Sequence, residues 1–311
     1  MNQTSGVVLT RNGSVYRVHT AAGEVGAVLR GKVKRDDDDR VVPGDVVDLE
    51  LQSGGDAAIT RVHPRRTVLA RRAAGGERVR RQQPIAANVD QVMIVTAARD
   101  PDPVPRMVDR FLVIAEANAL PAVLVVNKTD LDAGAADALT RRLTPAGYKI
   151  LRTSVKSGAG LDALGEQLRG RETVLAGQSG VGKSSLLNAL EPALGRRVGE
   201  VSARFGKGRH TTTAAELLPL AFGGYVVDTP GMREVGTWGL DPNSLAPCFP
   251  EFRPFLDQCR FDDCRHLVEP ACAVRAAAAA GAFDADRLAS YEKLYEEINV
   301  PSWSSAPRRE R

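Results

Sequence analysis

The spacing of apolar and polar positions changes twice along the chain, which predicts three structural parts. In the first 65 residues, short apolar runs alternate with turn formers such as Asn12-Gly13 and Gly54-Gly55, as in strands joined by tight turns. The expected strands cover residues 7–9, 15–18, 25–29, 46–51 and 57–62. Five short strands predict a small closed barrel, for which an OB-fold is favoured over an SH3-like barrel.

From about residue 88, near-continuous apolar runs alternate with helical periods. Strands are expected over residues 89–97, 122–127, 149–154, 172–176 and 224–228, and helices over 104–119, 135–143, 161–168 and 183–190. This alternation predicts a parallel sheet with helices on both faces.

The strands stop after about residue 239, where a Cys/His segment and helices at 273–280 and 286–298 follow. The expected fold class is therefore a multi-domain α/β protein. Its predicted parts are an N-terminal OB-like β-barrel (1–65), a basic connector (66–87), a central α/β domain (88–239), a C-terminal helical domain (240–300) and a disordered polar tail (301–311).

The composition, with 43% hydrophobic and 26% charged residues, is that of an ordinary soluble protein. No apolar run approaches the roughly 20 residues that a membrane helix needs. The first residues also lack the charged and apolar regions of a secretory signal. We therefore expect a cytoplasmic protein that does not associate with membranes.

Positive charge is concentrated in the N-terminal part. Residues 1–87 hold 15 Lys/Arg and 10 Asp/Glu, although the net charge of the whole chain is only +4. Within residues 61–81 the basic positions are Arg61, Arg65, Arg66, Arg71, Arg72, Arg78, Arg80 and Arg81, against one acid, Glu77. This asymmetry indicates contact with a polyanion, with a solvated surface as the alternative for any one of these charges. Because Tyr16 is the clearest aromatic residue of the barrel, contact with a nucleic-acid backbone is favoured over base stacking.

A phosphate-binding loop is the strongest chemical signal. The segment G-Q-S-G-V-G-K-S follows the expected strand at 172–176 and opens a helix, which is the context that the motif G-x-x-x-x-G-K-[ST] requires. Lys183 is expected to reach the β- and γ-phosphates, and the Ser184 hydroxyl to bind Mg²⁺. The other expected loop residues are Gly177, Gln178, Ser179, Gly180, Val181, Gly182 and Ser185.

The tetrapeptide N-K-T-D, residues Asn127, Lys128, Thr129 and Asp130, predicts that the base is guanine. It ends an apolar strand, at the sheet edge where α/β folds bind ligands. The Asp130 carboxylate can accept from the guanine N1–H and N2–H₂ groups together. Asn127 can bond the base edge and the loop, and the stem of Lys128 can lie over the ring. Ser154 and Val155 follow the next strand, where a backbone amide can contact the guanine O6.

Two further segments resemble GTPase switches. In D-T-P-G, Asp228 is expected to hold Mg²⁺ through water, and the Gly231 amide to sense the γ-phosphate. Met232 stands where Ras-like enzymes have the glutamine that orients the attacking water. In G-K-G-R-H-T-T-T (206–213), Thr212 is favoured over its two neighbours for Mg²⁺. His210 is a hypothetical water-positioning residue, with a plain surface histidine as the alternative.

The order of these motifs is unusual, because both base-binding loops precede the phosphate-binding loop. A βαβ sheet cut at a surface loop and rejoined at its old ends keeps its contacts. The order therefore predicts a circularly permuted P-loop GTPase domain, whose second switch leads directly into the Cys/His segment.

That segment predicts a structural zinc site. Cys259, Cys264, His266 and Cys272 follow the spacing C-x4-C-x-H-x5-C, and three thiolates with one imidazole suit a closed Zn²⁺ site. Redox cysteines are the alternative, and Asp262, Asp263 and Glu269 could substitute as ligands. Cys248 is expected to be a buried thiol.

Together, GQSGVGKSS, GRHTTT, DTPG, the permuted order and the Cys/His spacing behind a barrel closely resemble the RsgA (YjeQ) family, over about residues 5–298. The resemblance implies a GTPase that hydrolyses GTP to GDP and phosphate on the 30S ribosomal subunit, late in its maturation, in contact with 16S rRNA. It also implies a water-positioning role for His210 and one Zn²⁺ per chain. We expect a monomer. A regulatory GTPase with a protein partner, or a nucleic-acid-binding zinc protein with structural GTP, are the competing interpretations.

Overall fold

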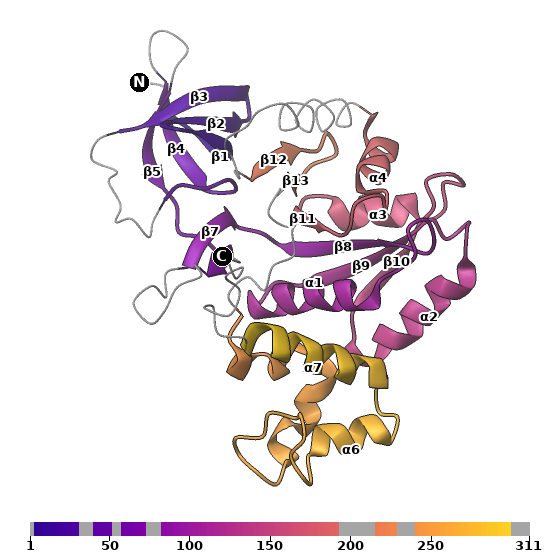
Figure 1. Cartoon of the computed structure of the whole chain (residues 1–311). Coiled ribbons are helices and arrows are strands. Elements are labelled where there is room, and N and C mark those ends of the chain that lie inside the picture. The colour runs from indigo at the N-terminus through magenta and orange to yellow at the C-terminus, as the bar shows by residue number, and fades with distance from the viewer. Residues whose placement is uncertain are drawn as a thin grey trace, which may run out of the picture.

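The computed structural model in Figure 1 describes residues 3–30, 40–51, 57–72, 82–192, 215–228 and 240–299. A small barrel, a central sheet with helices and a C-terminal helical part follow one another along the chain. This arrangement confirms the predicted fold class. No helix among these described residues is long and apolar enough to cross a membrane.

The N-terminal part is a closed five-stranded barrel. Its strands are β1 (Gln3–Asn12), β2 (Val15–Thr20), β3 (Gly23–Leu29), β4 (Val46–Leu51) and β5 (Ala57–Val62), in the order β1-β2-β3-β5-β4. Only β3 and β5 pair in parallel; the other neighbours are antiparallel. Alternate residues such as Val8, Val18 and Leu49 fill its core. This is the arrangement expected of an OB-like fold.

A hairpin occupies the region expected to be a connector. Strands β6 (Val68–Arg72) and β7 (Gln82–Ala87) form a two-stranded antiparallel sheet. Leu69 and Ala86 are fully buried in the core that lies under the central sheet. The segment is therefore packed against the α/β part rather than suspended between two parts.

The central sheet has six strands in the order β10-β9-β8-β11-β13-β12. They are β8 (Gln91–Ala97), β9 (Ala122–Asn127), β10 (Lys149–Arg152), β11 (Glu172–Ala176), β12 (Glu216–Pro219) and β13 (Tyr225–Asp228). All neighbours pair in parallel except β12, which runs antiparallel to β13 at the edge. The five strands expected from the sequence therefore pair in parallel, as predicted. The edge strand β12 was not predicted, and it can run antiparallel because a short return needs no helical crossover.

Helices cover both faces of this sheet, as expected (Figure 1). On one face lie α1 (Pro105–Ala117) and α2 (Ala133–Leu143), which bury Phe111, Leu112 and Leu139. On the other lie α3 (Leu161–Leu168) and α4 (Lys183–Leu190), which bury Leu164 and Leu186.

The C-terminal part contains a long 3-10 helix, η6 (Pro250–Gln258), then α6 (Ala273–Ala279) and α7 (Ala285–Asn299). An aromatic cluster forms its core: the rings of Phe249 and Phe252 stack 4.9 Å apart, and Tyr291 packs edge-on against both. Cys248 is buried as expected, and burial raises the pKa of its thiol to about 11.

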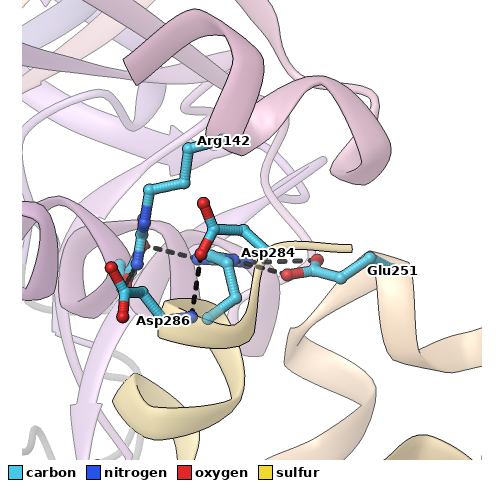
Figure 2. Close-up of polar contacts among 6 residues, drawn as sticks. Arg142, Glu251, Asp284 and Asp286 are labelled. Carbon is cyan, nitrogen blue, oxygen red and sulfur yellow. Dashed lines mark hydrogen bonds and ion pairs between the residues drawn. The ribbon is translucent and has the colours of Figure 1, made fainter. Parts of the chain in front are cut away.

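A buried network of charges joins this part to the GTP-binding domain expected from the motifs (Figure 2). Arg287 of α7 bonds Glu251 of η6 and Asp109 of α1, and Arg142 of α2 bonds the same Asp109 through both of its terminal nitrogens. All four side chains are at most 7% exposed. The C-terminal part is therefore attached through specific ion pairs as well as apolar contacts.

Candidate functional site

The phosphate-binding loop connects the end of β11 to the start of α4, as the motif predicts. Gly177 has φ +133°, and a Cβ there would lie 2.1 Å from the carbonyl oxygen of Val95. Gly182 has φ +97°, and a Cβ there would lie 2.3 Å from Nδ2 of Asn127. A side chain at either position would break the loop, because neighbouring backbone and the base-binding strand approach too closely.

Within this loop, Val181 is buried and anchors the turn in the sheet core. Ser179, Gly180, Ser184 and Ser185 are exposed. The ammonium of Lys183 donates to the carbonyl oxygens of Gly177 and Gln178, at 2.5 and 2.6 Å. The exposed residues of the loop thus face solvent at the carboxyl edge of the sheet, where a ligand has access to them.

The structure brings the N-K-T-D segment, 127–130, against the phosphate-binding loop, 177–184, although the two are far apart in the sequence. The buried Asn127 side chain donates from Nδ2 to the Val181 carbonyl oxygen at 2.9 Å. Its Oδ1 accepts from the Thr153 hydroxyl at 3.1 Å. Asn127 therefore ties three loops together through its side-chain amide.

Lys128 and Asp130 take up separate positions beside it. Lys128, with φ +59°, donates to the Gly180 carbonyl oxygen at 2.9 Å and also to the carbonyl oxygen of Asp100. Asp130 is exposed, and one of its carboxylate oxygens accepts from the Ser154 hydroxyl at 2.6 Å. The Thr129 amide donates to the Thr153 carbonyl oxygen at 3.2 Å, so the segment at 153–154 orients the tetrapeptide.

Ser154 itself is fully buried, and its amide donates to the Ala159 carbonyl oxygen at 3.0 Å. Val155 is 37% exposed at the same edge. Asp100 and Thr153 were missed by the motif analysis. Their position in the sequence could have indicated them, because each follows a strand of the sheet at the edge that carries the motifs.

Several predicted residues lie outside the described residues: the segment 206–213 with His210 and Thr212, and also Gly231 and Met232. The backbone of Asp228 ends β13, directly beside β11 and its phosphate-binding loop. The sheet thus brings the carboxyl end of β13 to the edge that carries the other nucleotide motifs.

The four predicted metal ligands converge in the C-terminal part. The Sγ atoms of Cys259, Cys264 and Cys272 and a ring nitrogen of His266 all lie within 4.8 Å of one another. Nδ1 of His266 is 3.5 Å from Sγ of Cys259 and 3.4 Å from Sγ of Cys272, and these two sulfurs are 3.9 Å apart. Zinc bonds of about 2.3 Å to sulfur and 2.0–2.1 Å to nitrogen would place tetrahedral donors about 3.5–3.8 Å apart. The donor set therefore fits a closed zinc site in both chemistry and spacing.

The surroundings of the cluster also fit a structural role. Burial lowers the pKa of His266, which favours the neutral imidazole that binds metals. Glu269, considered as a substitute ligand, instead accepts from the backbone amides of Arg265, Leu267 and Val268. Its carboxylate closes the loop between His266 and Cys272 and is not part of the cluster.

Comparisons with known proteins show the family of this chain. The sequence model of the RsgA GTPase family matches residues 62–238. A relative from Gemmatimonas aurantiaca, named "Small ribosomal subunit biogenesis GTPase RsgA", is 48% identical over 304 residues, which cover 95% of this chain and 97% of the relative. The chain belongs to the RsgA GTPase family. It is therefore a GTP hydrolase, as the motifs predict.

Solved RsgA-type structures share the fold. The crystal structure of YjeQ from Thermotoga maritima superposes with a TM-score of 0.77 at 34% identity, over 96% of this chain and 100% of that one. YloQ, described as a circularly permuted GTPase, superposes with a TM-score of 0.73 at 28% identity, over 99% of this chain and 97% of that one. The permuted motif order therefore belongs to the RsgA architecture.

The basic residues expected to meet RNA divide into two groups in this RsgA-type fold. Arg65 is only 12% exposed; it pairs with the fully buried Asp45 at 2.7 Å and donates to the Arg40 carbonyl oxygen at 2.6 Å. Arg66 pairs with Asp90 at 2.9 Å but stays 65% exposed. Arg65 holds the barrel together, so its charge is not available to a polyanion, whereas Arg66 remains at the surface. Arg78, Arg80 and Arg81 lie outside the described residues.

Proposed function

We propose that this chain hydrolyses GTP to GDP and phosphate on the 30S ribosomal subunit during a late step of its maturation, in contact with 16S rRNA. The observation that carries the proposal is the junction of Asn127, Lys128 and the phosphate-binding loop at one sheet edge. The relatives named for small-subunit biogenesis match nearly the whole chain, the barrel and the Cys/His cluster included. In this role the chain would act in the cytoplasm as a monomer.

Recognition of the base depends on Asp130 in this proposal. Ser154 holds one of its carboxylate oxygens at 2.6 Å, and the residue is exposed at the sheet edge. A carboxylate fixed in this way can accept from the guanine N1–H and N2–H₂ groups, a donor pair that adenine lacks. The Val155 segment next to it can reach the guanine O6 with a backbone amide.

The phosphates and Mg²⁺ belong at the neighbouring loop. Amides at the N-terminus of α4 and the Lys183 ammonium stabilise the phosphate charge, and Ser184, Thr212 and Asp228 would hold Mg²⁺. Mg²⁺ would neutralise charge on the β- and γ-phosphate oxygens as the bond to the leaving group breaks. The Gly231 amide would sense the γ-phosphate.

Hydrolysis needs an oriented water, and Met232 cannot orient one. We assign this function to His210, which the bound subunit would bring toward the γ-phosphate. Intrinsic rates of comparable small GTPases are about 10⁻⁴ s⁻¹, and elements supplied by a partner raise them by roughly 10³–10⁵-fold. The free enzyme should therefore be slow and the subunit-bound enzyme fast.

Single-turnover hydrolysis with and without 30S subunits tests the proposal. His210→Ala should lose most of the stimulated rate and keep its affinity for GTP and for the subunit, since only a transition-state interaction is removed. Equal stimulation of the variant would make His210 a bystander. Absence of stimulation and of co-sedimentation with 30S subunits in the wild type would refute the ribosomal function itself.

Contact with rRNA should act mainly through phosphates. Each neutralised phosphate adds about −0.9 to the slope of log K against log[salt] on a B-form duplex. Replacing Arg66, Arg71 and Arg72 by Ala should flatten the salt dependence of subunit binding. Arg65 is left unchanged because its loss would remove the cation that pairs with the buried Asp45 carboxylate. Binding that does not depend on salt would contradict this contact.

A further inference from the structure

The barrel and the central sheet share one apolar core along β12 and β13. Leu9 of β1 is fully buried in the same cluster as Leu217 of β12 and Val227 of β13. Its neighbour Val8 points the other way, into the core of the barrel. Strand β1 therefore belongs to two cores at once, and the barrel cannot shift without disturbing β12 and β13.

Strand β2 adds two polar contacts to the same pair of strands. Arg17 forms an ion pair with Glu216, the first residue of β12. Nδ1 of His19 lies 2.8 Å from the hydroxyl of Tyr225, the first residue of β13, and the two rings meet edge-on at 5.7 Å. Because β12 runs antiparallel to β13 and Glu216 pairs with Asp228, these two side chains of β2 contact opposite ends of the β12–β13 pair.

The barrel also presses on the start of β11. A Cβ at Gly44 would lie 2.1 Å from the Ala87 carbonyl oxygen and 2.9 Å from Oε2 of Glu172. Glu172 is 8% exposed, and its Oε2 has no hydrogen-bond partner among the described residues. A buried carboxyl oxygen without a partner costs free energy, so the docked arrangement carries a cost that a displaced barrel would relieve.

The same strands end at the nucleotide. β11 runs from Glu172 to Ala176 and into the phosphate-binding loop, and β13 runs from Tyr225 to Asp228. At about 3.3 Å per residue, the barrel contacts at Glu172 and Tyr225 lie roughly 10–15 Å from the nucleotide edge along these two strands. The contact at Glu216 lies beside Asp228 at that edge. Hydrogen-bonded pairing of β11 with β13 keeps the two strands in register, so a shift at one end moves the other.

We infer that Arg17 and His19 are positioning residues that couple the barrel to the nucleotide through β12 and β13. RNA held by the barrel would change the position of Asp228, and the bound nucleotide would change the affinity of the barrel for RNA by the same factor, because such coupling is reciprocal. The inference takes the identity of the barrel's ligand from the proposed function, but the coupling itself is a property of this chain.

The test combines Glu216→Gln with Tyr225→Phe, which removes both polar contacts and leaves the apolar core. The matched control is Glu24→Gln, because Glu24 pairs with the same Arg17 at 3.4 Å but lies within the barrel.

Subunit affinity is measured by co-sedimentation with GDP and with a non-hydrolysable GTP analogue, and hydrolysis is measured in single turnover. Coupling of this kind typically amounts to about 5–150-fold. We expect the double variant to lose at least about fivefold of the stimulated rate and of the affinity ratio between the two nucleotides. Nucleotide affinity and the rate without subunits should stay at the wild-type level.

Two further measurements separate coupling from a loss of folding and from a failure of the ribosomal function. In the variant Arg17→Glu with Glu216→Arg, the ion pair can form again with its charges reversed. The affinity ratio should therefore return to the wild-type level, which a merely damaged fold would not allow. Amide exchange of residues 15–20 in the free protein should differ between GDP and the GTP analogue, and the double variant should lose that difference. If the wild type shows no difference, or the double variant keeps its stimulation and affinity ratio, the coupling does not exist. A wild type that ignores 30S subunits yet shows the exchange difference would refute the proposed function and leave the coupling standing.

Discussion

Replacing Arg287 by Met should weaken the attachment of the C-terminal part to the α/β domain and lower the free energy of unfolding. The Arg287 side chain is 1% exposed and bonds the Glu251 carboxylate through Nε at 2.5 Å and Nη2 at 3.1 Å. Its Nη1 bonds Asp109 at 2.6 Å, and its guanidinium lies 4.6 Å from the centre of the Phe249 ring. Figure 2 shows Glu251 and Arg142 approaching the network from different elements. Methionine keeps much of the volume and removes the charge.

The size of the loss in unfolding free energy depends on the carboxylates that remain buried after the substitution. Asp109 keeps Arg142 as a partner, but Glu251 is left 2% exposed without the cation that it faces. Removing one partner of a buried ion pair typically costs about 3–5 kcal/mol. Burial alone would raise the pKa of Asp109, but the Arg142 hydrogen bond and the charges of Arg287 and Arg142 hold it below its ordinary value. Part of this stabilisation should therefore disappear as the pH falls through the lowered pKa.

Urea unfolding, monitored by circular dichroism with zinc present, measures the loss of unfolding free energy in Arg287→Met. Arg253→Met is the control, because Arg253 pairs with Glu116 across the same boundary but is 51% exposed; such surface pairs contribute about 0–1 kcal/mol. Adding Glu251→Met to Arg287→Met should recover most of the loss, since the unpaired carboxylate is then gone. A cost for Arg287→Met no larger than that of the control would refute the reasoning.

Three other predictions concern separate sites. Burial, with Asp90 nearby, raises the pKa of Glu172 from 4.5 to about 8; the native state therefore loses stability as the pH rises from about 4.5 to 8. Glu172→Gln should remove this loss, on the order of a few kcal/mol at pH 8, and unchanged pH-dependent melting would contradict it. Elemental analysis should find one Zn²⁺ per chain. Cys264→Ser should lower the melting temperature of residues 240–300 with little effect on nucleotide binding. A fully folded, zinc-free protein would refute the zinc site. Asp130→Asn should weaken GTP binding and improve xanthosine triphosphate binding in equilibrium titrations, whereas unchanged GTP affinity would disprove the role of Asp130.

Local chemistry made the nucleotide motifs readable in the sequence. A phosphate-binding loop needs glycines, a lysine and a hydroxyl at fixed spacing, and it must follow a strand and open a helix. Those requirements concern neighbouring residues, so Gly177 to Ser184 revealed the loop without any knowledge of the fold. The same holds for the Cys/His spacing and for the alternation of strands and helices, which predicted most elements to within a few residues.

Elements with weak local patterns were found only in the structure. β12 has four residues that end in a proline, Glu216–Pro219, too few for a periodic signal. The hairpin of β6 and β7 lies in an arginine-rich segment that looks solvent-exposed in sequence, yet Leu69 anchors it in the core. An edge strand and a docked hairpin are stabilised by distant partners, which composition does not record.

The partners of charged side chains were decided by tertiary packing alone. Arg65 and Arg66 are adjacent in an arginine-rich run, but one is bound to the buried Asp45 and the other stays at the surface. Arg287 finds Asp109 from 178 residues away. The sequence determined which chemical groups the chain carries and which short loops could bind phosphate, base and metal. Which charges became structural, and which strands the barrel holds, followed from the packing of remote elements, because a buried charge is stable only where the fold brings it a partner.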